Sequence, residues 1–372
     1  MSEIKVRERG LRGYKVTTSA ICSISDGLLY RGYPIEQIAK LSSFEETSYL
    51  ILNGELPTKK ELSEWSGRLV KYRRIPELVK MVMDHIPSNA HPMDVIRTGV
   101  SVLGISKPEV SKSPLKSVLR ILGVLPSIIG YWYARARGKI FNLKSIEEET
   151  YSGYLLRMIK EEYTEVERKM MNVSLILYAE HELNASTFSA RVCSSTAADY
   201  YACITNAICA LSGPKHGGAN EAVLNMISKF NSPNEGIEGV RKMLDTNQKV
   251  PGFGHPVYLS EDPRSAIIKE WAHQISLEKN DTKLYNIGTA IESIMHNECK
   301  DPCTFPNLDF YSAISYSVAE IEPVLFTPLF VISRACGWSA HILEQRIINE
   351  LLRPMANYNG PEKRTYIPIE QR

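Results

Sequence analysis

The sequence predicts an all-α fold with a small β-hairpin near the N-terminus. Two observations support this prediction. From residue 34 onward, helix-start signals and apolar helical patterns follow one another almost without a break. Only the segment Val16–Tyr33 combines many β-branched residues with a hairpin-turn signal. The length of 372 residues, with 44% hydrophobic and 23% charged residues, allows one large or two smaller globular domains.

The hairpin and three helix starts can be placed from local signals. Val16–Tyr33 contains Val, Ile, Thr and Ser around Asp26-Gly27, a typical hairpin turn, so two short strands are expected there. Three capping boxes, each a Ser or Thr followed three residues later by Glu, then mark helix starts at Ser43–Glu46, Thr58–Glu61 and Ser145–Glu148. The first of these helices should stop at Asn53-Gly54.

Longer helices are expected in the middle and at the end of the chain. Pro114–Arg137 predicts a helix kinked near Pro126, where the proline ring removes a backbone donor. Uninterrupted apolar patterns predict further long helices at Met170–Glu182, Ser186–Ser212 and Phe326–Ile348. The region 231–310 has shorter helical patterns and more polar loops, which is typical of a smaller, mobile domain.

Charge, apolar segments and cysteines exclude several classes of protein. The net charge is +2 and no long basic run occurs, so no nucleic-acid partner is expected. The polar start, Met1–Gly10, lacks the apolar core of a signal peptide. Leu115–Tyr133 carries charges and Ala197–Leu211 is short, so both predict buried helices and no membrane span. The seven cysteines form no CxxC pair, which predicts reduced thiols in a cytoplasmic protein without a metal site.

The nine residues Gly213–Glu221 are the strongest candidate for a functional site. Pro214 disfavours helix at the preceding residue, and Gly217 and Gly218 permit a turn or a close approach to a ligand. A new helix is expected from Ala219, so His216 is presented at a helix N-terminus, where a histidine tends to stay neutral and can donate to an enolate. Taken alone, the stretch is more simply interpreted as a glycine turn with a surface histidine.

Two further stretches, Pro251–Arg264 and Pro306–Asp309, complete a pattern that resembles the citrate synthase family, and its 2-methylcitrate synthase branch in particular. The resemblance covers nearly the whole chain and includes Tyr30–Tyr33, His91–Val95, His181–Arg191 and Arg353–Tyr358. It implies an all-α, citrate synthase-like fold with the site between two domains. The large domain would comprise residues 1–218 and 319–372, and the small inserted domain residues 219–318.

The resemblance also implies three catalytic roles. Asp309 would remove a proton next to the thioester, and its apolar neighbours would raise its basicity. His216 would stabilise the enolate by donating to the thioester oxygen, and His255 would polarise the ketone of oxaloacetate and protonate the alkoxide. Without the family pattern, Asp309 would be read as a helix cap and His255 as a turn residue.

Binding of a dicarboxylate calls for guanidinium groups, which bind carboxylates bidentately. The family pattern assigns substrate binding to His181, Arg264, Arg334 and Arg353, the last reaching into the partner's site of a homodimer. Coenzyme A is expected to contact the loop formed by Lys249, Val250, Pro251, Gly252 and Phe253. His341 and Glu344 have the spacing of a helix-borne ligand pair, but we interpret them as a solvated or packing pair because the reaction needs no metal.

The activity that the resemblance implies is condensation of propionyl-CoA with oxaloacetate and water to 2-methylcitrate and CoA, with side activity on acetyl-CoA and no cofactor. Resemblance to 2-methylcitrate synthases in Gly254–Tyr258, Thr327–Val331 and Arg353–Pro361 favours the propionyl substrate. Phe310 and Tyr311, beside the expected base, are candidates for the wall of the acyl pocket. The alternatives are citrate synthase, which uses acetyl-CoA, and a non-catalytic helical binding protein on the same scaffold.

Overall fold

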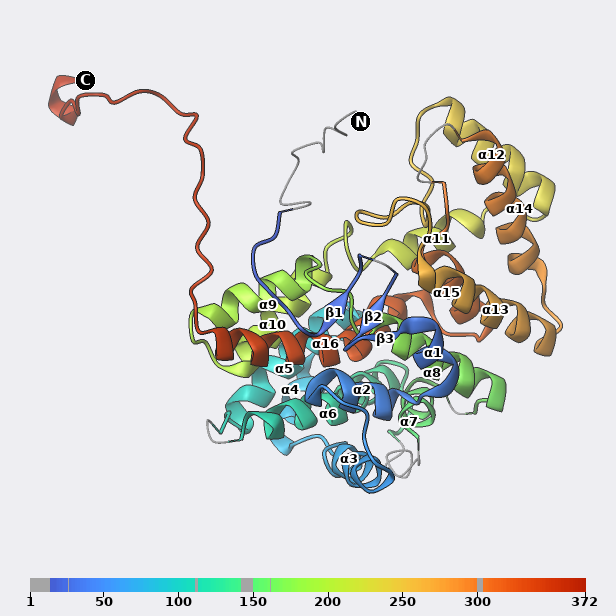
Figure 1. The fold of residues 1–372 in the computed structure, drawn as a ribbon, viewed down its shortest axis with the longest axis horizontal. Helices are drawn as coiled ribbons and strands as arrows, with labels where there is room; N and C mark the ends of the chain where they lie inside the picture. The colour runs from blue at the N-terminus through green and yellow to red at the C-terminus, as the bar shows by residue number, and fades with distance from the viewer. Residues whose placement is uncertain (1–13, 26, 111–112, 142–149, 161, 300–303) are drawn as a thin grey trace.

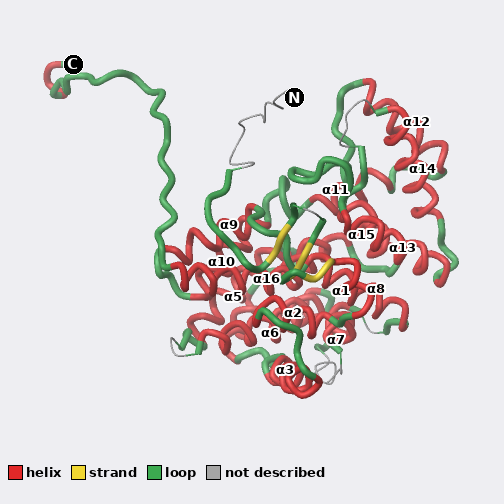
Figure 2. The backbone as a smooth tube through the Cα atoms, in the orientation of Figure 1, coloured by secondary structure: helices red, strands yellow, loops and turns green. Residues whose placement is uncertain are grey.

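The structure is a computed structural model, and it describes residues 14–25, 27–110, 113–141, 150–160, 162–299 and 304–372. Helices dominate these residues, and the strands are confined to one small sheet near the N-terminus (Figures 1 and 2), which confirms the predicted fold class. β1 (Cys22–Ser23) and β2 (Leu29–Tyr30) pair antiparallel as expected. A third strand, β3 (Tyr33–Pro34), pairs with β2 and was not predicted.

The larger group of helices packs around α16, which is buried along most of its length. α16 runs from Phe326 to Ile348, the predicted bounds, and packs against α2, α5, α6, α8, α9, α10 and α11. The other helices of this group are α1 (Ile35–Leu41), α2 (Phe44–Asn53), α3 (Lys59–Lys71), α4 (Glu77–His85), α5 (Pro92–Ser106), α6 (Pro114–Ala136), α7 (Tyr151–Ile159), α8 (Glu165–Tyr178), α9 (Ala185–Ser195) and α10 (Tyr200–Leu211).

The predicted helix starts are largely confirmed where the structure describes them. Thr58 caps α3 in a reciprocal box with Glu61, and Ser43 caps α2, which ends at Gly54 with a φ of 97°. The box at Ser145–Glu148 lies outside the described residues. Within them, α6 is the one helix long and apolar enough to cross a membrane, and 83% of its most apolar stretch is buried, as expected of a core helix.

One predicted helix was wrong. Ser186–Ser212 forms two helices, α9 and α10, with a break at residues 196–199. Ala197 has a φ of 63°, and Asp199 caps α10 by accepting from the backbone N–H groups of Tyr201 and Ala202. The break turns α10 back against α9, so the small side chains of this stretch let two helices pack closely.

The remaining helices gather on one side of the molecule (Figure 1). They are α11 (Ala219–Ile227), α12 (Pro233–Asp245), α13 (Pro263–Glu278), α14 (Lys283–Glu298) and α15 (Leu308–Val318). They pack mainly on one another, while α13 also contacts α1 and α8 and α11 contacts α16. The division into domains 1–218 with 319–372 and 219–318 stays a prediction, and its limits coincide with the start of α11 and the end of α15.

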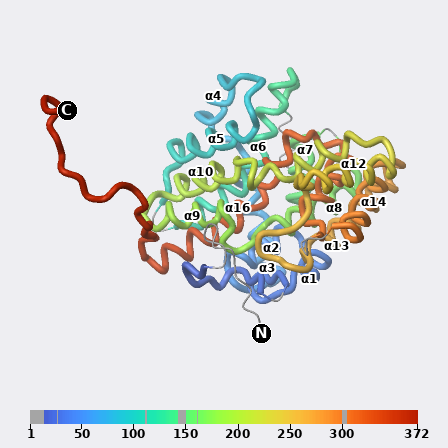
Figure 3. Tube along the Cα trace, turned by 90° about the horizontal axis from the view of Figure 1, so that it is seen from above, coloured from blue at the N-terminus to red at the C-terminus, as the bar shows by residue number. Residues whose placement is uncertain are grey.

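The C-terminal residues form an extended tail. Short 3-10 turns occur at Pro323–Leu325, before α16, and at Ile369–Gln371 near the end. After α16 the chain leaves the helical body, and two views at right angles show it projecting away from it (Figures 1 and 3). Near its start, the backbone N–H of Leu352 donates to Ser195 Oγ at 3.1 Å, which ties the tail to the end of α9.

Candidate active site

The predicted site residues lie at helix ends and loops that approach one another from both helical groups. His181 follows α8, His216 precedes α11, and His255 lies in the loop before α13. Asp309 is in the first turn of α15, and Arg334 is on α16. The contacts described below link His216, Asp309 and Arg334 through the rings of Tyr178 and Phe330. A second cluster joins His181 to His255 and Tyr258.

His216 is held by the start of α9. Its Nε2 lies 2.8 Å from Ser186 Oγ and accepts a 3.3 Å hydrogen bond from the Ser186 backbone N–H. A neutral His216 therefore carries its proton on Nδ1, which is available as a donor. Burial, with a smaller contribution from the positive charge of Arg334, lowers the pKa of His216 to about 4. The imidazole is neutral at physiological pH, as its sequence context predicts.

Gly217, beside this histidine, is required by close packing. A Cβ at this position would lie 2.4 Å from the carbonyl oxygen of Leu211 and 2.8 Å from the side chain of Thr327. Thr327 Oγ1 is 3.0 Å from the Gly217 carbonyl oxygen, so α16 holds the turn in place. The glycine therefore permits a close approach of backbone segments next to His216.

Asp309 combines a helix N-terminus with a half-buried setting. Asn307 caps α15 by accepting from the Asp309 backbone N–H, which leaves the Asp309 carboxylate free of the capping role. Tyr178 donates its hydroxyl hydrogen to Asp309 Oδ1 at 2.7 Å. Burial raises the pKa of Asp309, and the Tyr178 hydrogen bond opposes this effect. The carboxylate is a stronger base than an exposed aspartate.

His255 and His181 form an aromatic cluster with Tyr258. The backbone N–H groups of Val257 and Tyr258 donate to His255 Nδ1 at 3.1 and 3.2 Å, so neutral His255 carries its proton on Nε2. The two histidine rings are 5.0 Å apart between centroids, and His181 Nε2 lies 3.0 Å from the Tyr258 hydroxyl. Burial, then the charge of Arg264, lowers the pKa of His181 well below its usual value. His181 is therefore a neutral, hydrogen-bonding group.

Arg264 is locked by a carboxylate that the sequence analysis did not single out. Its Nε and Nη2 donate to the two carboxylate oxygens of Asp262 at 2.9 and 2.8 Å. Asp262 Oδ2 also accepts from the Leu308 backbone N–H at 3.1 Å. Burial would raise the pKa of Asp262, but Arg264 holds it below the ordinary value. The pair fixes Arg264 and connects it to the helix that carries Asp309.

Arg334 is buried on α16 and lies beside an aromatic pair. Its Nε donates to the Tyr178 carbonyl oxygen at 2.6 Å, and its guanidinium carbon lies 4.8 Å from the centroid of the Phe330 ring. Phe330 also packs against Tyr178, with ring centroids 4.7 Å apart, and against His216 at 5.9 Å. The rings of Tyr178 and Phe330 therefore border the region between His216 and Asp309.

Phe310 and Tyr311, the candidates for the wall of the acyl pocket, are both buried side chains. Phe310 is fully buried and packs against Phe253 at 4.8 Å between ring centroids. Tyr311, also fully buried, donates its hydroxyl to Glu292. Both sit in the core of the α11–α15 group, whereas the Tyr178 hydroxyl contacts Asp309 and the Phe330 ring packs against Tyr178.

The loop 249–253 is tied to the segment that precedes Asp309. The Asn307 backbone N–H donates to the Gly252 carbonyl oxygen at 2.9 Å, and the Gly254 N–H donates to the Phe305 carbonyl oxygen at 2.9 Å. Gly252 has a φ of 82°, and a Cβ there would lie 2.7 Å from Phe310 and from Val223. In this loop Lys249 is exposed, while Val250, Gly252 and Phe253 are buried and Pro251 is half-buried.

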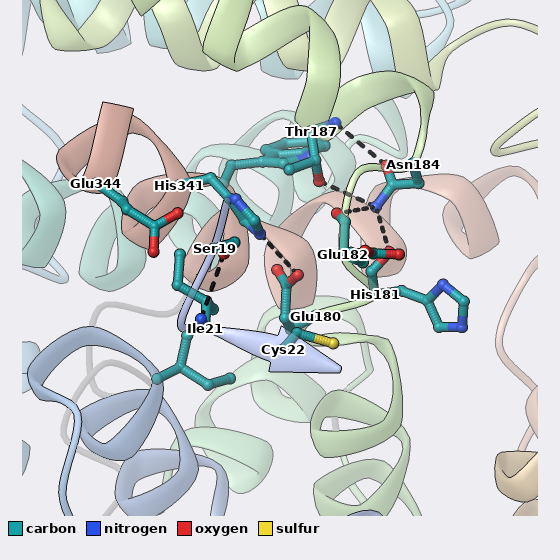
Figure 4. A network of polar contacts seen from close by, with 12 residues as sticks. Ser19, Ile21, Cys22, Glu180, His181, Glu182, Asn184, Thr187, His341 and Glu344 are labelled. Atoms are coloured by element: carbon teal, nitrogen blue, oxygen red, sulfur yellow. Dashed lines mark hydrogen bonds and ion pairs between the residues drawn. The ribbon is translucent and has the colours of Figure 1, made fainter. Parts of the chain in front are cut away.

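Arg353 does not join the other site residues within the chain. It is exposed in the C-terminal tail, which projects from the helical body (Figure 2). Of the two interpretations of His341 and Glu344, the packing one agrees with the structure and the solvated one does not. His341 is fully buried, and its Nε2 lies 2.9 Å from Glu180 Oε1 (Figure 4). Both His341 and Glu344 also contact Arg191. Within the part of the chain that the structure describes, no cluster of three metal-ligating side chains occurs.

Comparisons with known proteins agree over nearly the full length. The model of the family described as "Citrate synthase, C-terminal domain" matches residues 10–355. A protein named 2-methylcitrate synthase from Shewanella oneidensis is 41% identical, covering 99% of both chains. A protein named citrate synthase 2 from Bacillus subtilis is 40% identical, covering 98% of this chain and 99% of the relative.

Solved structures match equally well. Citrate synthase from Thermotoga maritima superimposes with a TM-score of 0.87 at 36% identity, covering 98% of this chain and 99% of that one. Citrate synthase from Thermoplasma acidophilum, described as a ternary complex with carboxymethyl coenzyme A and oxaloacetate, gives a TM-score of 0.89 at 30% identity. That match covers 97% of this chain and 98% of the archaeal one.

Proposed function

Because the chain belongs to the citrate synthase family, whose members are enzymes that condense an acyl-CoA with oxaloacetate, we propose that its preferred acyl substrate is propionyl-CoA. The reaction is then propionyl-CoA plus oxaloacetate plus water to 2-methylcitrate plus CoA. The main support for this choice of substrate is the full-length identity to a protein named 2-methylcitrate synthase. The nearly equal identity to a protein named citrate synthase 2 makes acetyl-CoA the second candidate.

In the first step, Asp309 removes a proton from the carbon next to the thioester. Its raised pKa makes it a better acceptor than an ordinary aspartate. His216 donates from Nδ1 to the thioester oxygen, because Nε2 is occupied by the Ser186 backbone N–H. A neutral imidazole matches the weak acidity of an enol better than an imidazolium would, so its lowered pKa suits this role.

In the second step, the enolate carbon attacks the ketone of oxaloacetate. His255 donates from Nε2 to the ketone oxygen and delivers its proton to the alkoxide as the carbon–carbon bond forms. Arg264 and Arg334 hold the two carboxylates, and buried His181 contributes a further hydrogen bond. Water then cleaves the C–S bond, which releases CoA as the thiol and creates the third carboxylate of the product.

The remaining roles concern coenzyme A and a second subunit. The backbone of residues 249–253 is proposed to contact coenzyme A, and no cofactor is required by the steps above. We place Arg353 in the site of a partner subunit, because in its own chain it is exposed on the C-terminal tail, which projects from the helical body. The proposal therefore includes a cytoplasmic homodimer with shared sites.

The preference for propionyl-CoA is tested by kcat/KM for both thioesters at saturating oxaloacetate, measured as thiol release in one buffer. One methylene in an apolar pocket discriminates by about 10- to 200-fold, so acetyl-CoA should react more slowly but measurably. Preference for acetyl-CoA would identify a citrate synthase. Absence of thiol release with either substrate would favour a non-catalytic binding protein.

A further inference from the structure

Glu180 is a buried carboxylate that the proposed mechanism does not use. It directly precedes His181, and its side chain has no exposed surface. Oε1 contacts His341, but Oε2 has no hydrogen-bond partner in the described structure. An unsatisfied buried carboxylate oxygen is costly, and such groups call for an explanation.

His341 does not neutralise this carboxylate. Arg191 Nη1 lies 2.9 Å from His341 Nδ1 and can only donate, so Nδ1 is the acceptor. The imidazole proton is therefore on Nε2, which donates to Glu180 Oε1 at 2.9 Å (Figure 4). The contact is a hydrogen bond from a neutral histidine, and the negative charge of Glu180 stays uncompensated there.

The two substrate-binding guanidinium groups differ in their own counter-ions. Arg264 forms an ion pair with Asp262. Among the described residues, no carboxylate lies within ion-pair distance of Arg334, which donates to a backbone carbonyl instead. Burial lowers the pKa of Arg334, and the charge of Glu180 is the largest influence in the opposite direction. The field of Glu180 therefore reaches the group that holds a substrate carboxylate.

Glu180 is also prevented from approaching Arg334 directly. His341 holds Oε1, and Oε2 is pressed against Gly337, where a Cβ would lie only 2.0 Å away. The Gly337 N–H donates to the carbonyl oxygen of Ala179 at 3.2 Å, so the backbone before Glu180 is fixed to α16 as well. A carboxylate held in this way influences Arg334 electrostatically and leaves its guanidinium available to a ligand.

We propose that Glu180 is a fixed negative charge that limits how tightly the site holds anions, and that it favours release of the trianionic product over release of dianionic oxaloacetate. The repulsion grows with ligand charge, and hydrolysis of the thioester adds a carboxylate. The proposal rests on the condensation with oxaloacetate described above and is independent of the acyl chain. Glu180 acts without touching substrate.

The test is calorimetric binding of oxaloacetate and of citrate, a trianion at about pH 8, to the intact protein without acyl-CoA. Glu180→Gln keeps the hydrogen-bond acceptor and the volume but removes the charge. At a separation near the Debye length, about 8–10 Å, and an effective dielectric constant of about 20, a unit charge changes affinity about two- to threefold per ligand charge. Oxaloacetate should bind about four- to ninefold more tightly, and citrate about eight- to 30-fold.

Two further variants separate charge from structure. Glu180→Asp keeps the charge and should preserve the wild-type ratio of citrate to oxaloacetate affinity. Glu344→Gln removes a carboxylate of the same network whose charge is paired with Arg191, so it should also preserve the ratio. Unfolding temperatures of all variants confirm that the compared proteins are folded.

Several outcomes would overturn the proposal. Weaker binding of both anions to Glu180→Gln, or an unchanged ratio, would leave Glu180 a structural residue. If Glu180→Gln is the one variant that does not fold, the role of the Glu180 charge is to stabilise the fold. If the wild-type protein fails to bind oxaloacetate, it is the proposed function that fails, so the two failures are distinguishable.

Discussion

The hydrogen bond from Tyr178 to Asp309 should determine the pH at which the enzyme becomes active. Tyr178→Phe removes the hydroxyl that donates to Asp309 Oδ1 at 2.7 Å and keeps the ring that packs against Phe330. A hydrogen bond to a charged group contributes about 1.5–3 kcal/mol, which corresponds to about one to two pKa units. The bond stabilises the ionised carboxylate, so its loss raises the pKa of Asp309 further.

The assay is the pH dependence of kcat/KM for the acyl-CoA at saturating oxaloacetate. The acid limb, where activity rises as Asp309 ionises, should move to higher pH by about one to two units in Tyr178→Phe. Above this limb the variant should keep activity within about tenfold of wild type, because a more basic carboxylate is still present.

Ser312→Ala is the matched control. Ser312 Oγ lies 2.7 Å from the Tyr178 hydroxyl but donates to the backbone of Asp309, so the carboxylate keeps its donor. This variant should shift the limb much less. An unmoved limb in Tyr178→Phe, or a shift to lower pH, would refute the assignment of Asp309 as the base.

Three other predictions concern the base, the loop and the tail. Asp309→Asn should lower turnover by about 10²- to 10⁴-fold. Because the pKa of folded Asp309 is raised, its ionised form costs stability above that pKa, so thermal unfolding at neutral pH should occur at a higher temperature in this variant. Gly252→Ala should lower the free energy of unfolding by about 2–4 kcal/mol, because the new Cβ adds backbone strain and overpacking. Gly54 also has a positive φ but lies in open space, so Gly54→Ala should lower the free energy of unfolding by the strain alone. Denaturant unfolding measures both values. Mixing inactive Arg353→Ala and Asp309→Asn subunits should restore thiol release if sites are shared; failure, with subunit exchange confirmed, would place Arg353 in its own subunit's site.

Helices whose limits carry strong local signals could be predicted from the sequence. Phe326–Ile348 was predicted at its observed bounds, because a long apolar segment ends before a polar tail. The break between α9 and α10 was missed, because residues 196–199 contain neither Gly nor Pro. The helix cap at Asp199 was the one local signal there, and an aspartate within an apolar run is easily read as a helical residue.

Candidate catalytic residues could be identified because they stand in Gly- and Pro-containing motifs, while their supporting residues could not. Tyr178 and Ser186 lie in helical patterns, and their bonds to Asp309 and His216 span 131 and 30 residues. Phe310 and Tyr311 could be named only as candidates for the acyl pocket, because adjacency in sequence does not determine which face of α15 is buried. Long-range packing determines both the supporting contacts and the buried face of α15, and a single sequence does not show which distant residues pack together.

The charges around Asp309 couple its basicity to the presence of the first substrate. Burial raises the pKa of Asp309, whereas the hydrogen bond from Tyr178 and then the positive charges of Arg264 and Arg334 lower it. Oxaloacetate brings two carboxylates to these guanidinium groups and offsets their effect, so the base should strengthen when the ketone is already in place. The enolate would then form mainly in active sites that already hold oxaloacetate, with which it reacts. We therefore expect the acid limb of kcat/KM for the acyl-CoA, measured at saturating oxaloacetate, to lie at higher pH than the limb of kcat/KM for oxaloacetate. The opposite order would mean that another group controls proton removal.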